Sequence, residues 1–252
     1  MKYPIFLVFL FVLVACEPSK KSLTAQEIVN EAIAVAGGSK FDSAAYSFQF
    51  RDKQYFASRN KGLFTLARTF KDTTGIVKDV ITNSGFTRYV NNKPVVIADS
   101  TKAQLHAAVN SVHYFAVLPY GLNDAAVNKE LLGTVSIKNT PYYKIKVTFN
   151  EAGGGEDYED VFIYWIHTNT FKTAYLAYSY EEDDGIGFRF REAFNERYVG
   201  EMRFVDYNNY KTEKTDILVE DLDDLFENNS LTLVSKINLE AIKMAASFSV
   251  AD

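Results

Sequence analysis

The three histidines of this sequence are the side chains that could bind a metal ion or exchange a proton near neutral pH. His106 and His113 lie seven residues apart in a segment with helical periodicity, so they share a face two turns apart. A zinc-binding helical pair needs a spacing of four residues. His167 lies in a turn at the end of a predicted strand. We therefore interpret all three as surface or boundary residues and predict no metal site.

Two groups of carboxylates could also bind a cation. Glu156, Asp157, Glu159 and Asp160 form the first group, and residues 181–184 form the second. A calcium loop places its ligands at alternate positions and closes on a bidentate glutamate, and neither group has that pattern. Both groups are interpreted as solvated hairpin loops, with loose cation binding as the alternative. The sequence predicts no metal and no cofactor.

Patterns typical of a catalytic nucleophile are missing from the sequence. It has no Gly-x-Ser-x-Gly elbow and only one cysteine, which lies near the N-terminus. A Schiff-base aldolase would need a (β/α)₈ barrel, whereas this chain has runs of consecutive predicted strands. We predict that the protein is not an enzyme, and a hydrolase or lyase is the third choice among its functions.

The single cysteine, Cys16, follows a short apolar run at the N-terminus. Lys2 precedes the apolar residues 5–14, a run too short for the about 20 residues of a membrane span. Ala15 is the small residue that signal cleavage requires. The order Leu-Val-Ala-Cys resembles the lipobox of bacterial lipoproteins. The resemblance implies cleavage after Ala15 and lipidation of the Cys16 sulfur, and an ordinary signal peptide is the alternative.

Length and composition predict one domain behind this N-terminal segment. Residues 1–15 are predicted to be a lipoprotein signal peptide, 16–22 a lipidated tether, 23–244 a single domain and 245–252 a C-terminal tail. The formal net charge of -5 argues against nucleic acid and against a polybasic membrane surface. The predicted partners are the membrane, through the lipid anchor, and no nucleic acid. A protein partner stays open.

Helical periodicity marks two long segments. Residues 25–36 form the first, with Thr24 as N-cap and Glu27 as its capping-box partner. Asp99-Ser100-Thr101 is predicted to cap the second. Its apolar stripe comprises Leu105, Ala108, Val109, Val112 and Ala116. A short third helix is predicted at 219–227.

Alternating apolar residues predict two blocks of strands joined by tight turns. The first block comprises residues 44–50, 54–59, 62–70, 76–82, 86–90 and 94–98, and the second comprises 131–137, 142–149, 161–167, 174–180, 187–196, 202–210 and 231–239. Turns this short imply antiparallel neighbours. Neither face of 161–166 is polar, so that strand should be central and covered on both sides.

This order of elements resembles the LolA/LolB-like lipoprotein-carrier superfamily. A closer resemblance, to lipoproteins of unknown role from gram-negative bacteria of the Bacteroidetes group, covers nearly the whole mature chain. The stretches that carry it are 110–115, 118–122, 153–157 and 204–207. The implied fold is α+β and mainly β, a curved antiparallel sheet forming an incomplete barrel, with helices packed in its concave face. The implied location is the gram-negative cell envelope. Because no acidic run follows Cys16, an outer membrane position facing the periplasm is favoured.

The superfamily resemblance implies that the concave face binds or passes an apolar ligand, such as a lipid or an acyl chain. The candidate lining residues are aromatic side chains of the predicted strands: Tyr46, Phe48, Phe50, Phe64, Phe149, Trp165, Tyr178, Phe188 and Phe190. Ordinary core packing is the alternative for each of them. For the whole protein, the alternative is a non-catalytic scaffold lipoprotein of the envelope with no ligand.

Overall fold

A computed structural model describes residues 22–154, 158–182 and 185–245 of the chain. The predicted signal peptide, Ala15, Cys16 and nearly all of the tether lie outside these residues, as does the tail beyond residue 245. Within the described residues, no helix is both long enough and apolar enough to cross a membrane.

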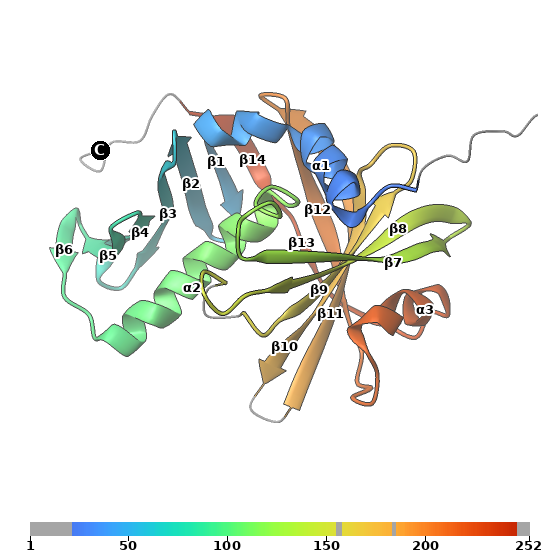
Figure 1. The fold of residues 1–252 in the computed structure, drawn as a ribbon. Coiled ribbons are helices and arrows are strands. Elements are labelled where there is room, and N and C mark those ends of the chain that lie inside the picture. The colour runs from blue at the N-terminus through green and yellow to red at the C-terminus, as the bar shows by residue number, and fades with distance from the viewer. Residues whose placement is uncertain (1–21, 155–157, 183–184, 246–252) are drawn as a thin grey trace, which may run out of the picture.

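The described strands form two seven-stranded antiparallel sheets, drawn side by side in Figure 1. The first sheet has the order β14-β1-β2-β3-β4-β5-β6 and the second the order β13-β12-β11-β10-β9-β8-β7. The first comprises β1 (Ala45–Phe50), β2 (Lys53–Asn60), β3 (Leu63–Asp72), β4 (Gly75–Thr82), β5 (Gly85–Val90), β6 (Lys93–Val95) and β14 (Glu240–Met244). The second comprises β7 (Val127–Ile137), β8 (Thr140–Phe149), β9 (Val161–His167), β10 (Thr173–Glu182), β11 (Gly185–Val199), β12 (Met202–Lys211) and β13 (Thr232–Ile237). The predicted fold class, mainly β, antiparallel and not closed into a barrel, is confirmed.

The first helix, α1 (Ala25–Ala36), packs on the second sheet. Its capping box is confirmed, since the Glu27 N–H donates to Thr24 Oγ1 at 3.2 Å and the Thr24 N–H donates to Glu27 Oε2 at 2.8 Å. Ile28 and Val29 are fully buried in a cluster that includes Tyr164 of β9 and Val205 of β12. A 3₁₀ turn, η1 (Gly38–Ser43), leads from α1 into β1.

The long helix α2 (Asp99–Ala116) crosses in front of the sheets in Figure 1. The prediction that Asp99, Ser100 and Thr101 cap it is wrong, because Ala98 is the N-cap residue and makes no side-chain bond. These polar residues instead occupy the first turn, where an acidic side chain is favoured by the helix dipole. Ala108 was placed in the apolar stripe but is exposed, whereas Val109 is fully buried.

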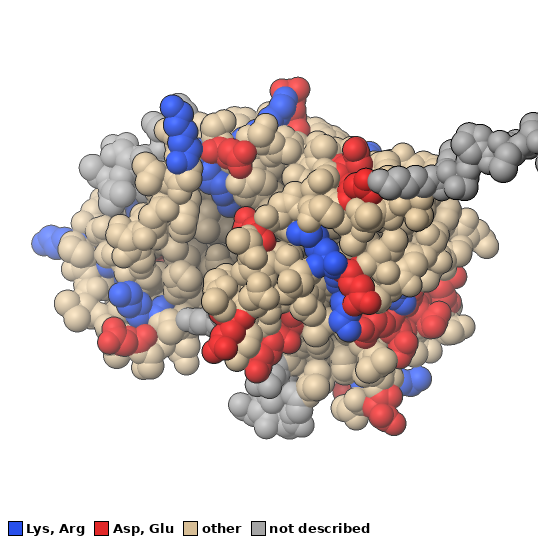
Figure 2. All heavy atoms as spheres, viewed as in Figure 1, with Lys and Arg blue, Asp and Glu red and all other residues tan. Residues whose placement is uncertain are grey.

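The opposite face of the second sheet is covered by a third helical segment. It consists of η2 (Val219–Asp221) and α3 (Leu222–Glu227), so the helix predicted at 219–227 is confirmed. The segment is rich in carboxylates, and acidic side chains gather over it at the right of Figure 2. Two of them bind lysines of β8, with Lys144 Nζ 3.0 Å from Asp223 and Lys146 Nζ 2.6 Å from Glu220. This acidic segment therefore has a role in holding the helix on the sheet.

Strand β9 lies inside the second sheet, between β8 and β10. Tyr164 packs into the cluster under α1, while Trp165 packs into the cluster under α3, and both side chains are fully buried. The prediction of a central strand covered on both faces is confirmed.

The connection from β13 to β14, the last described strand, joins the two sheets. The sequence predicted a single strand at 231–239, but β13 ends at Ile237 and a further strand, β14, pairs with β1 of the first sheet. Leu239 lies in the connection between them. The chain thus passes from the edge of one sheet to the edge of the other.

Candidate functional site

A cavity of about 250 Å³ lies beneath the C-terminal half of α2. Both sheets and the helix contribute to its lining, which consists of Phe50 of β1, Ser111, Val112, Phe115 and Ala116 of α2, Tyr178, Arg191, Val205, Tyr207 and Ile237 of the second sheet, and Leu239. Ser111 is exposed, so it marks where the cavity meets the surface. The lining is largely apolar, with one cation.

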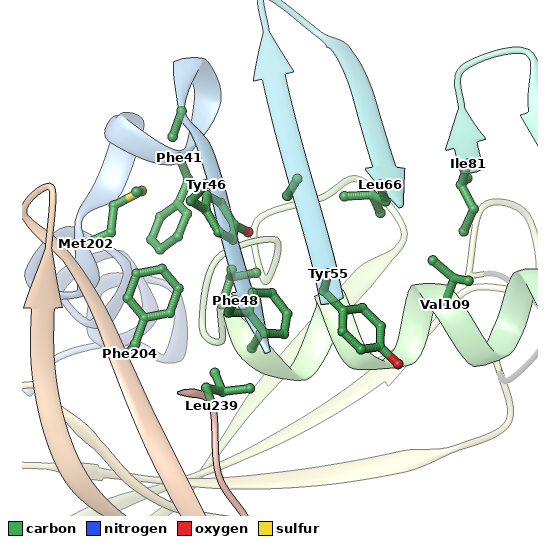
Figure 3. Close-up of a cluster of buried hydrophobic side chains, with 14 of the residues drawn as sticks. Phe41, Tyr46, Phe48, Tyr55, Leu66, Ile81, Val109, Met202, Phe204 and Leu239 are labelled. Carbon is green, nitrogen blue, oxygen red and sulfur yellow. The ribbon is translucent and has the colours of Figure 1, made fainter. Parts of the chain in front are cut away.

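Helical geometry explains why α2 presents these side chains together. Val112, Phe115 and Ala116 stand at spacings of three and four residues, so they lie on one face of the helix. Figure 3 shows the neighbouring cluster, in which Phe48 and Phe204 lie close to Leu239. The cavity therefore continues the core between the two sheets.

His113 lies on the same helix but faces the first sheet. It is fully buried, Nε2 lies 3.1 Å from the carbonyl oxygen of Ala67, and its ring meets the edges of Phe48 and Tyr55. Burial lowers the pKa of His113 from 6.5 to about 3, so the ring is neutral. The interpretation of His113 as a surface or boundary residue is wrong, because α2 turns it into the core.

The neutral His113 makes stability depend on pH. Between about pH 6.5 and 3 the unfolded chain takes up a proton at this residue that the folded chain does not, so stability falls as the pH falls through that window. The slope from one such proton approaches about 1.4 kcal/mol per pH unit. In urea unfolding, His113→Gln should lose this part of the pH dependence. Parallel pH profiles for the variant and the wild type would contradict the assignment.

The other two histidines lie in partly buried positions. Nδ1 of His167 accepts from the backbone N–H of Asn169 at 3.0 Å and of Thr170 at 3.3 Å, which fixes the predicted turn after β9. Among the described residues, no group of three histidine, cysteine or acidic side chains is placed to hold a metal ion.

Arg191 of β11 is the charged residue of the cavity. It is 8% exposed, and its Nη2 donates to the Tyr178 hydroxyl at 2.8 Å. The guanidinium carbon lies 3.9 Å from the centre of the Phe115 ring. The guanidinium of Arg191 is therefore contacted by Phe115 of α2 and by Tyr178 of β10. Its Nε–H is buried and has no acceptor in the part of the chain that the structure describes.

The centre of the Tyr207 ring lies 6.0 Å from the guanidinium carbon of this cation. Burial raises the pKa of Tyr207, and Arg203 and Arg191 lower it only in part. The phenol is therefore protonated at neutral pH. Because it lines the cavity, a neutral polar group lies beside the positive charge.

The aromatic residues proposed from the sequence as ligand lining occupy four different places. Phe50 and Tyr178 line the cavity. Tyr46, Phe48 and Phe64 belong to or pack on the cluster of the first sheet, and Phe149 packs on the cluster under α1. Trp165, Phe188 and Phe190 lie on the other face of the second sheet, against α3. In the second sheet, alternation along β10 and β11 places Tyr178 on the opposite face from Phe188 and Phe190. Contact of any of these residues with a ligand stays a prediction.

Several lining residues were missed as candidates. Val112 and Ala116 stood in the apolar stripe of α2 and could have been found by asking what the stripe covers. Arg191 alternates with Phe190 along β11, a pattern that indicates a solvated face for the arginine. In the structure α2 covers this face of β11, so Arg191 is buried rather than solvated.

The fold and cavity define a class: an open, mainly β, antiparallel protein with a helix closing an apolar cavity. The chain belongs to a family of unknown function, DUF6503, whose model matches residues 4–239. No curated protein matches it.

Solved structures similar to this chain include three bacterial proteins. A LolA superfamily protein from Nitrosomonas europaea is 14% identical, with a TM-score of 0.49 over 90% of this chain and 96% of that one. A DUF1329 family protein from Desulfovibrio piger is 10% identical, with a TM-score of 0.44 over 91% and 97%. An outer membrane lipoprotein-sorting protein domain from Vibrio parahaemolyticus is 6% identical, with a TM-score of 0.38 over 89% and 94%. The first of these structures bears the name of the superfamily that the sequence resembles.

Proposed function

We propose that this protein is a lipid-anchored component of the gram-negative cell envelope that binds an apolar ligand in the cavity beneath α2. The ligand belongs to the lipid or acyl-chain class, and the function is binding or transfer without catalysis. The observation that carries the proposal is the cavity itself, walled by apolar side chains from the helix and both sheets.

The size and lining of the cavity suit a hydrocarbon chain. Each methylene moved from water into an apolar site contributes about 0.8 kcal/mol, so a few methylenes suffice for measurable binding. The cavity volume of about 250 Å³ lies just below the range of about 300–1,000 Å³ typical of small-molecule sites. We infer that it admits a segment of one chain.

The N-terminal segment supplies the anchor in this proposal. Residues 1–15 are removed as a signal peptide, Cys16 carries the lipid, and residues 16–22 form the tether. Seven extended residues reach at most about 25 Å, so the domain stays close to the bilayer. We place it at the outer membrane, facing the periplasm.

Removing the Cys16 thiol tests the anchor. We expect Cys16→Ser to abolish incorporation of radiolabelled palmitate and to prevent cleavage, because the acyl chains are attached to this sulfur. Metabolic labelling followed by gel electrophoresis measures both. Lys2→Gln, which leaves the thiol in place, is the control. Retained label in the serine variant would contradict the anchor.

Displacement of an uncharged dye tests the binding function. Full-length protein held in an amphipathic polymer should enhance the fluorescence of N-phenyl-1-naphthylamine in a saturable manner, above a polymer-only blank. Hexadecanol should displace the dye, because both molecules are apolar and uncharged. Absence of saturable binding would contradict the proposal and would favour a scaffold role without a ligand.

A further inference from the structure

We propose that the ligand of the cavity carries an anionic head group, a carboxylate or a phosphate, and that Arg191 binds it. This inference rests on the proposed function, because it assigns the chemistry of the same ligand. Its basis is a positive charge that is 92% buried at an apolar cavity and has no negative partner among the described residues.

Other buried arginines of the chain have carboxylates beside them. Arg68 lies 2.7 Å from Asp79, and Arg203 Nε lies 2.5 Å from Glu196. Among the described residues, the polar and ring contacts of Arg191 are with one hydroxyl and three aromatic rings, and its Nε–H has no acceptor. A buried charge is costly unless it is paired and hydrogen-bonded, so a cation left in this state indicates a missing partner.

The surroundings of Arg191 hold its guanidinium in a fixed plane. Tyr178 accepts from Nη2, the Phe115 ring lies against one face, and the Tyr178 and Tyr207 rings lie 5.1 and 6.0 Å from the guanidinium carbon. A planar guanidinium presents a fork of donors that matches two oxygens of a carboxylate or phosphate. Lysine, as a point charge, would not provide this fork.

Apolar side chains line the same cavity as the Arg191 cation. Val205 of β12 lines the same cavity, and Ile237 and Leu239 extend the lining toward the first sheet. An anion at Arg191 would therefore leave its hydrocarbon tail in contact with these side chains. From this arrangement we infer that the ligand is an amphiphile with one negatively charged end, such as a fatty acid or a lipid phosphate.

Three competitors with the same hydrocarbon chain distinguish the contribution of the head-group charge to affinity from that of the chain. Hexadecanol, hexadecanoate and hexadecyl phosphate are titrated against bound N-phenyl-1-naphthylamine on the full-length protein. We expect at least one anion to bind about tenfold more tightly than the alcohol, the factor that one charge-assisted hydrogen bond provides. The anion that binds more tightly identifies the source, a fatty acid or a lipid phosphate.

The variant Arg191→Gln should bind the alcohol and the two anions with equal affinity, and circular dichroism verifies that it folds. Arg191→Lys should keep part of the preference. Lys236→Gln removes one positive charge next to the lining residue Ile237, at an exposed position that does not line the cavity, and should retain the full preference. Equal affinity of alcohol and anions for the wild type would overturn the inference while leaving the proposed function intact. Failure of all three competitors and of the dye would overturn both.

Discussion

Replacement of Asp79 by asparagine is expected to lower the free energy of unfolding by about 3–5 kcal/mol, the cost of breaking a buried ion pair from one side. Asp79 of β4 is fully buried and lies between two arginines. Its Oδ2 accepts from Arg68 Nη2 at 2.7 Å, and its Oδ1 accepts from Arg88 Nε at 2.6 Å. The three residues face one another across β3, β4 and β5. Asparagine keeps the shape but leaves two positive charges without compensation.

Urea unfolding at neutral pH measures this loss, and a matched surface variant controls for charge removal. Asp52 also binds a cation, with Lys53 Nζ at 2.8 Å, but it lies in the exposed turn between β1 and β2. Asp52→Asn should leave the unfolding midpoint unchanged, because water screens such pairs. A shift of the same size in both variants, or no shift for Asp79→Asn, would refute the buried network.

Filling the cavity is expected to weaken apolar ligand binding more than tenfold. Val112 projects from α2 into the cavity, so Val112→Trp would place a large ring where we expect the ligand chain. Excluding two methylenes from the site removes about 1.6 kcal/mol, which already exceeds a factor of ten in the dissociation constant. Titration with N-phenyl-1-naphthylamine measures the loss.

The matched control places the same ring elsewhere on the same helix. Asn110 is exposed and does not line the cavity, so Asn110→Trp should bind the dye as the wild type does. Circular dichroism of both variants verifies that α2 and the sheets are intact. Unchanged binding by a folded Val112→Trp protein would show that the dye occupies another site.

Local patterns predicted most of the elements that build this fold. The capping box of Thr24 and Glu27, the two-sided burial of 161–166 and the antiparallel strand blocks depend on neighbours in sequence, and the structure confirms each of them. Strand β14 was missed because its pairing with β1 joins residues about two hundred positions apart in the chain. No short-range pattern carries that information.

The cavity was harder to predict than the fold for the same reason. Alternation along β11 separates Phe190, under α3, from Arg191, at the cavity, but it does not show which face α2 covers. His113 is predicted from the sequence to be a surface or boundary residue, because its spacing from His106 does not suit a metal site. Both residues are buried by contacts between elements, which only the folded chain reveals.

Photo-crosslinking in membranes tests the central claim, that the cavity beneath α2 binds an apolar chain. Full-length protein would be exposed to hexadecanoic acid that carries a diazirine within its hydrocarbon chain, irradiated, digested and mapped by mass spectrometry. We predict labelled peptides that contain residues 111–116 and 205–207, with the label lost in Val112→Trp and retained in Asn110→Trp. Labelling confined to peptides that do not line the cavity, or labelling that Val112→Trp leaves unchanged, would contradict the claim.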